Sequence, residues 1–170
     1  MGGSLGLAAR AKAGVQTVLG YSRSRATLDL ALERGAITKA CDSLEEAAAG
    51  ADLIFVCTPV RLVVDHMRRA LEAAPSDAVI SDVGSTKGAL MQALNSAEQS
   101  RCIGGHPLCG SETAGVGNAS ATLYEGATYF LTPGTHVDAV PISVFTSSSP
   151  RSAPGRWRST QPNTTASWLW

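Results

Sequence analysis

The sequence lacks several features that identify whole classes of protein. Its fourteen basic and fourteen acidic residues cancel, so the overall charge gives no basis for binding nucleic acid or an anionic membrane. No apolar run is long enough to span a bilayer. The start shows no signal-peptide pattern, and Gly6 stands where a myristoylation signal requires serine or threonine. These absences favour a small molecule as partner, with no nucleic acid and no membrane.

Cysteine is scarce and shows no pattern. Cys41, Cys57, Cys102 and Cys109 form no CxxC pair and have no metal-ligand spacing with histidine. We therefore expect reduced thiols in a cytoplasmic protein and no metal site. Cys109 is interpreted as a small packing residue, because no base other than His106 accompanies it.

Apolar residues make up 44% of the 170 residues, which is enough for the core of one ordinary domain. Strand-like and helix-like segments alternate along the chain. Strands are expected at 15–21, 52–58, 78–83 and 127–132, with 101–105 leading into a loop around His106. Helices are expected at 5–13, 26–34, 43–50, 61–74 and 88–97. This alternation predicts an α/β fold with a doubly wound parallel sheet.

Polar clusters follow four of the expected strands. They are Ser22 with Arg23, Thr58 with Pro59, the segment 82–87, and His106. Ligands of doubly wound sheets bind at the carboxyl ends of the strands. The four clusters therefore point to one crevice.

The segment from Gly104 to Gly115, GGHPLCGSETAG, carries the strongest candidate for catalysis. Gly104 and Gly105 allow the backbone to approach a ligand closely, and Pro107 fixes φ directly after the histidine. An imidazole held in this way suits general base catalysis at neutral pH, whereas a structural or solvated role is the alternative for His106. The other two histidines, His66 and His136, are interpreted as solvated or incidental.

Gly2, Gly3 and Ser4 precede an expected helix, an arrangement that presents backbone N–H groups to a phosphate. A plain helix cap is the alternative, since the full GxGxxG fingerprint is not present. A dinucleotide fold needs a strand before this turn, in the middle of the order 3-2-1-4-5-6. We therefore expect the sheet to lack that first strand.

The segment from Tyr21 to Arg25 bears on the choice of cofactor. No carboxylate stands where one would bind the ribose 2′-hydroxyl of NAD. Arg23 beside Ser22 suits a 2′-phosphate, which favours NADP over NAD, with a solvated basic turn as the alternative.

Ser85 follows an expected strand and opens a helix, so its hydroxyl could cap the helix or bind a ligand. Lys87 is either an ordinary first-turn surface residue or, because the helix dipole disfavours a cation there, a residue with a further role. Glu112 could be an ordinary first-turn carboxylate.

Taken together, the GGS start, DVGSTKG, GGHPLCGSETAG and the FLTP segment resemble the prephenate and arogenate dehydrogenase family of tyrosine biosynthesis. The resemblance extends from Gly2 to about Pro133. It implies oxidative decarboxylation of prephenate or arogenate, with hydride transfer to NADP or NAD and formation of an aromatic ring. It also implies an incomplete Rossmann-type sheet, and a homodimer for complete members.

The resemblance assigns roles to residues of the expected crevice. His106 matches the catalytic histidine, which would accept the hydroxyl proton, and Ser85 matches the serine that positions that histidine and the nicotinamide. Glu112, with Ser111 beside it, matches the edge of the substrate pocket. For the cofactor, Gly2 matches the last fingerprint glycine, and the segment 58–59 matches the one that passes along the dinucleotide.

The chain also departs from the family pattern. Residues 1–135 are expected to form a truncated dinucleotide-binding domain, and residues 136–170 an irregular tail in place of the family's helical domain. Shifted codons for 163–170 permit a family-like HD motif, so we hypothesise a frameshift between about Pro133 and Thr146 and a start assigned too late. Impaired folding and activity are expected for such a chain. The alternatives are a non-catalytic nucleotide-binding or interaction fragment and a related hydroxyacid dehydrogenase.

Overall fold

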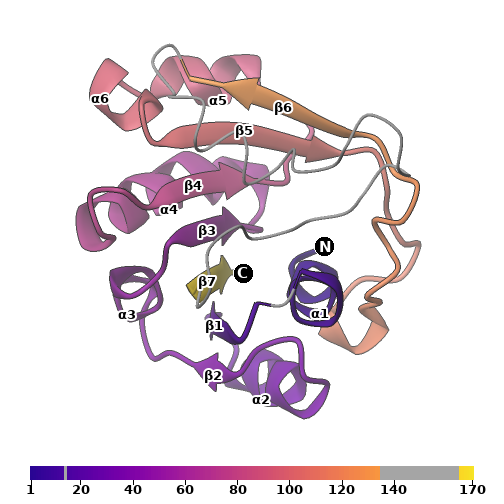
Figure 1. Ribbon diagram of the computed structural model, residues 1–170. Helices are drawn as coiled ribbons and strands as arrows, with labels where there is room; N and C mark the ends of the chain where they lie inside the picture. Colours follow the sequence, from indigo (N-terminus) through magenta and orange to yellow (C-terminus); the bar gives the residue numbers. More distant parts are fainter. Residues whose placement is uncertain (14, 135–164) are drawn as a thin grey trace.

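The computed structural model describes residues 1–13, 15–134 and 165–170, in which seven strands form one sheet. The strand order is β2-β1-β7-β3-β4-β5-β6 (Figure 1). All neighbours are parallel except β5 and β6. The strands are β1 Thr17–Tyr21, β2 Lys39–Ala40, β3 Leu53–Val56, β4 Val79–Asp82, β5 Cys102–Pro107, β6 Tyr129–Pro133 and β7 Thr165–Leu169.

Helices cover both faces of the sheet (Figure 1). On one face lie α1 Gly2–Lys12 and α2 Arg25–Glu33, and on the other lie α3 Leu44–Ala49, α4 Val60–Ala73 and α5 Gly88–Ala93. The short α6 Ser96–Gln99 and a 3-10 turn at Val116–Asn118 complete the helical elements described. Among the helices of the described residues, none has the length and apolar character needed to cross a membrane. The expected doubly wound, Rossmann-type α/β fold is confirmed.

The core consists of two clusters, one on each face of the sheet. In β3, Leu53 and Phe55 pack in the cluster that includes residues of α1 and α2. Ile54 and Val56 pack in the other cluster, together with residues of α3 and α4. All four side chains of β3 are buried, which explains why the sequence of this strand is continuously apolar.

Helix ends mostly lie within one or two residues of the predicted positions, and the exceptions have local causes. Ser43 accepts a hydrogen bond from the Glu46 backbone N–H (2.9 Å), which starts α3 where expected. The helix predicted to reach residue 97 ends at Ala93. Asn95 and Glu98 form a reciprocal capping box that starts α6 instead.

The middle of the sheet, where the sequence predicted a missing strand, is occupied by β7. This strand pairs in parallel with both neighbours, and Ser167 lies opposite Leu19 of β1 and Ile54 of β3. Trp168 is 1% exposed, and its ring centroid lies 5.6 Å from that of Phe55. The prediction of no strand pattern between residues 146 and 170 is therefore wrong for 165–169. His136 and the rest of the segment 135–164 lie outside the described residues.

Candidate active site

His106 lies in strand β5 and not in a loop, contrary to the sequence-based expectation. The strand extends to Pro107 because β6 pairs with it antiparallel, with His106 opposite Phe130. The imidazole is half-buried, and its centroid lies 6.4 Å from that of the Phe130 ring. The strand backbone thereby sets the direction of the His106 side chain, a role that the flanking glycine and proline residues were expected to have.

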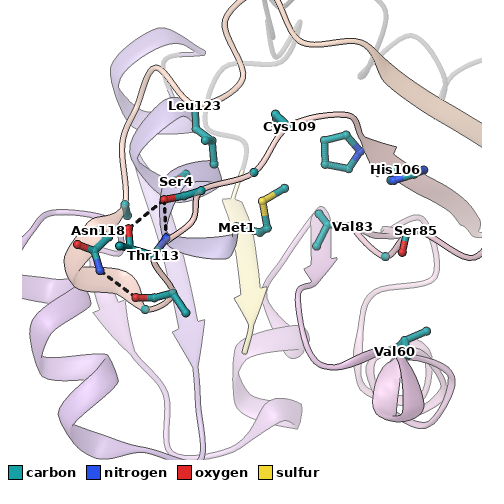
Figure 2. A pocket seen from close by; sticks show the side chains of 17 residues that line it. Met1, Ser4, Val60, Val83, Ser85, His106, Cys109, Thr113, Asn118 and Leu123 are labelled. Carbon is teal, nitrogen blue, oxygen red and sulfur yellow. Dashed lines mark hydrogen bonds between the residues drawn. The ribbon is translucent and has the colours of Figure 1, made fainter.

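A cavity of about 550 Å³ lies beside His106, within the size range of small-molecule sites. Figure 2 shows His106 and Ser85 on one side of this active-site cavity and Ser4 and Asn118 on the other, with Met1 between them. The two residues predicted to be catalytic therefore share one cavity. Its lining consists of Met1, Ser4, Val60, Val83, Gly84, Ser85, His106, Pro107, Cys109, Gly110, Ser111, Thr113, Ala114, Gly115, Asn118, Ala119 and Leu123.

The predicted substrate residues differ in their placement. Ser111 is exposed and lines the active-site cavity, and its hydroxyl lies 3.0 Å from that of Thr113. Glu112 is exposed and is not among the lining residues. The structure therefore brings Ser111, but not Glu112, to the cavity that holds His106.

The residues predicted to form a phosphate turn before the helix are instead the first residues of α1, because the helix begins at Gly2. Gly2 and Gly3 line a second cavity of about 190 Å³, and Trp170 also lines it. No acidic residue occupies the first turn of α1, so its N–H groups and dipole favour an anion. Ser4 faces the active-site cavity, and its hydroxyl accepts a hydrogen bond from the Ser120 N–H (3.1 Å).

The remaining predicted cofactor residues line neither of these two cavities. Arg23 is exposed after β1, and the hydroxyl of half-buried Ser22 accepts a hydrogen bond from the Ser24 N–H (3.2 Å). Pro59 is the residue before α4, and the hydroxyl oxygen of Thr58 is buried without a hydrogen-bond partner. The next residue, Val60, does line the active-site cavity, so this segment reaches its edge.

One residue of the site was not singled out from the sequence. Asp82 ends β4 with a fully buried side chain, and its carboxylate pairs with Lys87. The available signal was the unexplained Lys87 five residues later, in a position that the helix dipole disfavours.

Burial keeps the thiols protonated, which agrees with a packing role for them. It raises the pKa of Cys102 to about 12, and it also raises the pKa of Cys109, which lines the active-site cavity. All four cysteines are free. Within the described ranges, no three His, Cys, Asp or Glu side chains are grouped so as to hold a metal ion.

His66 corrects a further expectation, because it is not solvated. The residue is 8% exposed within α4, and its Nδ1 has no hydrogen-bond partner. Burial lowers the pKa of His66, and the nearby charge of Arg69 lowers it further.

Comparison with known proteins agrees with what the geometry of the site indicates. Residues 5–146 match the family described as prephenate dehydrogenase, nucleotide-binding domain. The chain is 32% identical over 141 residues to a prephenate dehydrogenase of Bacillus subtilis, covering 81% of this chain and 38% of that protein. It is 29% identical over 144 residues to a cyclohexadienyl dehydrogenase of Zymomonas mobilis, covering 84% and 49%.

Solved structures show the same likeness. Prephenate dehydrogenase from Aquifex aeolicus superposes with a TM-score of 0.78 at 27% identity, over 84% of this chain and 52% of that one. A second structure of the A. aeolicus enzyme, with a TM-score of 0.77, is a complex with hydroxyphenyl propionate and NAD+. Synechocystis arogenate dehydrogenase has a TM-score of 0.72 at 25% identity, over 99% of this chain and 55% of that one. The chain thus spans about half or less of the length of these proteins.

Proposed function

The chain belongs to the prephenate dehydrogenase family, and we propose that it carries the catalytic residues for oxidative decarboxylation of prephenate or arogenate in tyrosine biosynthesis. The observation that supports this most is that His106 and Ser85 line one cavity of about 550 Å³. A reaction of this class needs a base next to the substrate hydroxyl and a group that holds the base in place. These two residues supply both.

The imidazole of His106 accepts the proton of the ring hydroxyl as the carbonyl develops. The Ser85 hydroxyl orients that imidazole or the reacting end of the cofactor by hydrogen bonding. Ser111, which also lines the cavity, is positioned to contact the substrate. Bound NAD(P)+ would supply the hydride acceptor, with carbon dioxide leaving as the ring becomes aromatic.

The cofactor would be held at the N-terminus of α1. Gly2 and Gly3 carry no side chains there, and the first turn contains no acidic residue, which fits a pyrophosphate. Arg23 and Ser22 at the end of β1 support NADP as the favoured cofactor, because a guanidinium binds a 2′-phosphate well. The indole of Trp170 fills space beside Gly2, so we expect it to move when the cofactor binds.

The reduced state of the thiols supports a cytoplasmic location, and we propose that the complete family proteins act as homodimers. We also propose that the partner of this chain is a small-molecule substrate.

The proposal is tested by measuring reduced cofactor formed by the full chain with prephenate, arogenate and a panel of hydroxyacids, each with NAD+ and NADP+. We expect impaired activity with prephenate or arogenate, and His106→Asn should lower the remaining kcat by roughly 10²–10⁴-fold. Ser85→Ala should also lower kcat, whereas Ser100→Ala, a serine outside the cavity, should not. Turnover confined to hydroxyacids would refute the assignment.

A second candidate function is a non-catalytic nucleotide-binding or interaction fragment. The place of the Trp170 indole beside Gly2 favours an interaction fragment over a nucleotide-binding one, since the side chain stands in the way of a tightly bound dinucleotide. Thermal stabilisation by NADP+ without turnover would support a nucleotide-binding fragment.

A further inference from the structure

The carboxylate of Asp82 joins the end of β4 to the neighbouring strand β5. Its Oδ2 accepts hydrogen bonds from Lys87 Nζ and from the Gly84 backbone N–H, the latter at 2.8 Å. Its Oδ1 accepts a hydrogen bond from the Gly105 backbone N–H at 3.1 Å. One fully buried group thus bonds both to the turn after β4 and to β5.

The two glycines are the sequence neighbours of the residues proposed to act in catalysis. Gly84 directly precedes Ser85, and Gly105 directly precedes His106. A shift of either glycine N–H relative to the Asp82 carboxylate would therefore move one of these side chains relative to the other. Asp82 itself does not line the active-site cavity, so its effect must pass through these neighbours.

The backbone pairing of β4 with β5 ends before Asp82 and Gly105. The register of β4 and β5 extends to the pair Ser81 and Ile103, and Asp82 and Gly105 lie beyond it. The chains nevertheless stay close, because a Cβ on Gly105 would lie 2.4 Å from the Asp82 carbonyl oxygen. The Tyr129 hydroxyl donates to that same oxygen at 3.4 Å, which adds β6 to the group.

The charges make this arrangement difficult to change. The side chain of Asp82 is 0% exposed and that of Lys87 is 12% exposed. Loss of either partner would leave a charge poorly solvated, which is strongly unfavourable in a protein interior. The pair therefore explains the cation at the N-cap of α5.

We infer that Asp82 is a positioning residue, whose carboxylate fixes Ser85 and His106 relative to each other. This inference rests on the function proposed above for those two residues. Because a misplacement of about 1 Å can cost about 10²-fold in rate, the effect of losing one bond should be measurable.

The test uses the full chain with Asp82→Asn and with the double variant Asp82→Asn/Lys87→Met. An asparagine NH₂ group cannot accept from a backbone N–H, so one of the two glycine bonds is lost. The double variant also removes the ammonium that would otherwise remain buried without its carboxylate. We expect kcat to fall about 10–100-fold with KM changed less than about twofold. NMR should show shifted amide signals of Gly84 or Gly105 and an altered titration curve for the His106 ring.

A destabilised control separates positioning from stability. Val63 is fully buried in α4, and it makes no part of the Asp82 bonding group. Val63→Ala should lower the denaturation midpoint while leaving kcat and the His106 titration curve unchanged. If Val63→Ala changed kcat and the His106 titration curve as much as Asp82→Asn does, a positioning role for Asp82 would be contradicted.

The outcomes distinguish this inference from the proposed function. Folded Asp82 variants with unchanged kcat and unchanged His106 signals overturn it. If the single variant does not fold, the double variant decides by the same readings. If the unaltered chain shows no turnover, the proposed function fails, while the NMR signals of Gly84, Gly105 and His106 still decide whether Asp82 holds them.

Discussion

The indole of Trp170 lies against Gly2 at the start of α1. A Cβ placed on Gly2 would come within 1.8 Å of Trp170 Nε1, so only glycine fits beside the indole. The Trp170 backbone N–H donates to the Tyr21 carbonyl at 2.9 Å, which holds the residue at the end of β1. In a dinucleotide fold the turn after the central strand needs glycine, because the pyrophosphate approaches the backbone there. Strand β7 therefore fills the middle of the sheet, and the residue that follows it brings a tryptophan to the place proposed to hold the pyrophosphate.

We expect Trp170→Gly to tighten the binding of NADP+ or NAD+ by about tenfold. The indole must leave the space beside Gly2 before a pyrophosphate can approach, and this displacement reduces the apparent affinity. Isothermal titration calorimetry of the full chain measures the change. Leu32→Ala, which removes an apolar side chain of α2 that is 36% exposed, is the control and should leave the affinity unchanged. Equal affinities for Trp170→Gly and the unaltered chain would show that the indole does not compete.

Most of the fold could be predicted because its signals are local. The buried strand β3 was identified by its continuous apolar run, and α3 by the Ser43 cap. Strand β2 has only two residues, Lys39 and Ala40, and carries no periodicity that could identify it. His106 was assigned to a loop because its diglycine and proline suggest one, whereas pairing with β6 extends the strand through it.

The place of β7 could not be predicted from local pattern. Its pairing joins residues such as Leu19 and Ser167, which lie far apart in the sequence. The five-residue strand has little alternation, and only its burial between β1 and β3 makes it a central strand. The frameshift hypothesis stays a prediction that the bases of the gene can test. At the site, Asp82 was missed because its role depends on the separate strand that carries Gly105.

Strand β7 should contribute much of the stability of the sheet. Trp168 is 1% exposed and packs in the core cluster on the α1 side. We expect Trp168→Ala to lower the free energy of unfolding by about 3–5 kcal/mol, as for other large-to-small core substitutions. Urea denaturation measures this. Leu108→Ala, at a residue 53% exposed, should change it by less than about 0.5 kcal/mol. A Trp168→Ala chain as stable as the control would mean that β7 is not part of the folded sheet in solution.

Arg23 should decide between the two nicotinamide cofactors. If its guanidinium binds the 2′-phosphate, Arg23→Ala loses a charged hydrogen bond worth about 1.5–3 kcal/mol, which weakens NADP+ binding at least tenfold. The affinity for NAD+, which lacks that phosphate, should change little. Arg10→Ala serves as the control, because Arg10 is also exposed and its guanidinium donates to the Gly35 carbonyl. Parallel loss of affinity for both cofactors would contradict the assignment of Arg23 to the 2′-phosphate.

Two glycines of the histidine segment should differ sharply in their tolerance of a methyl group. A Cβ on Gly105 would lie 2.4 Å from the Asp82 carbonyl oxygen, whereas a Cβ on Gly110 meets nothing within 4 Å. We expect Gly105→Ala to destabilise the fold by about 1–3 kcal/mol, because backbone must shift to accept it. Gly110→Ala should stay within about 0.5 kcal/mol of the unaltered chain. Thermal denaturation compares the two variants, and equal midpoints would contradict the close approach of β4 and β5.

His66 should make the stability of the fold depend on pH. Burial lowers its pKa from the ordinary 6.5, with Arg69 and Arg23 lowering it further and Asp65 and Glu45 opposing them. The unfolded chain therefore binds a proton more readily than the folded chain. This contribution to stability is fully present above pH 6.5 and is lost as the pH falls below that value towards the folded pKa.

Replacing this histidine by an apolar residue removes the group that titrates. We expect His66→Leu to lose less stability than the unaltered chain between neutral and mildly acidic pH, as measured by urea denaturation across that range. The leucine also removes a buried Nδ1 without a hydrogen-bond partner, so the variant should be at least as stable at neutral pH if it packs without strain. An identical loss of stability on acidification in both chains would mean that His66 is accessible to protons in the folded state, and hence that α4 does not bury it in solution.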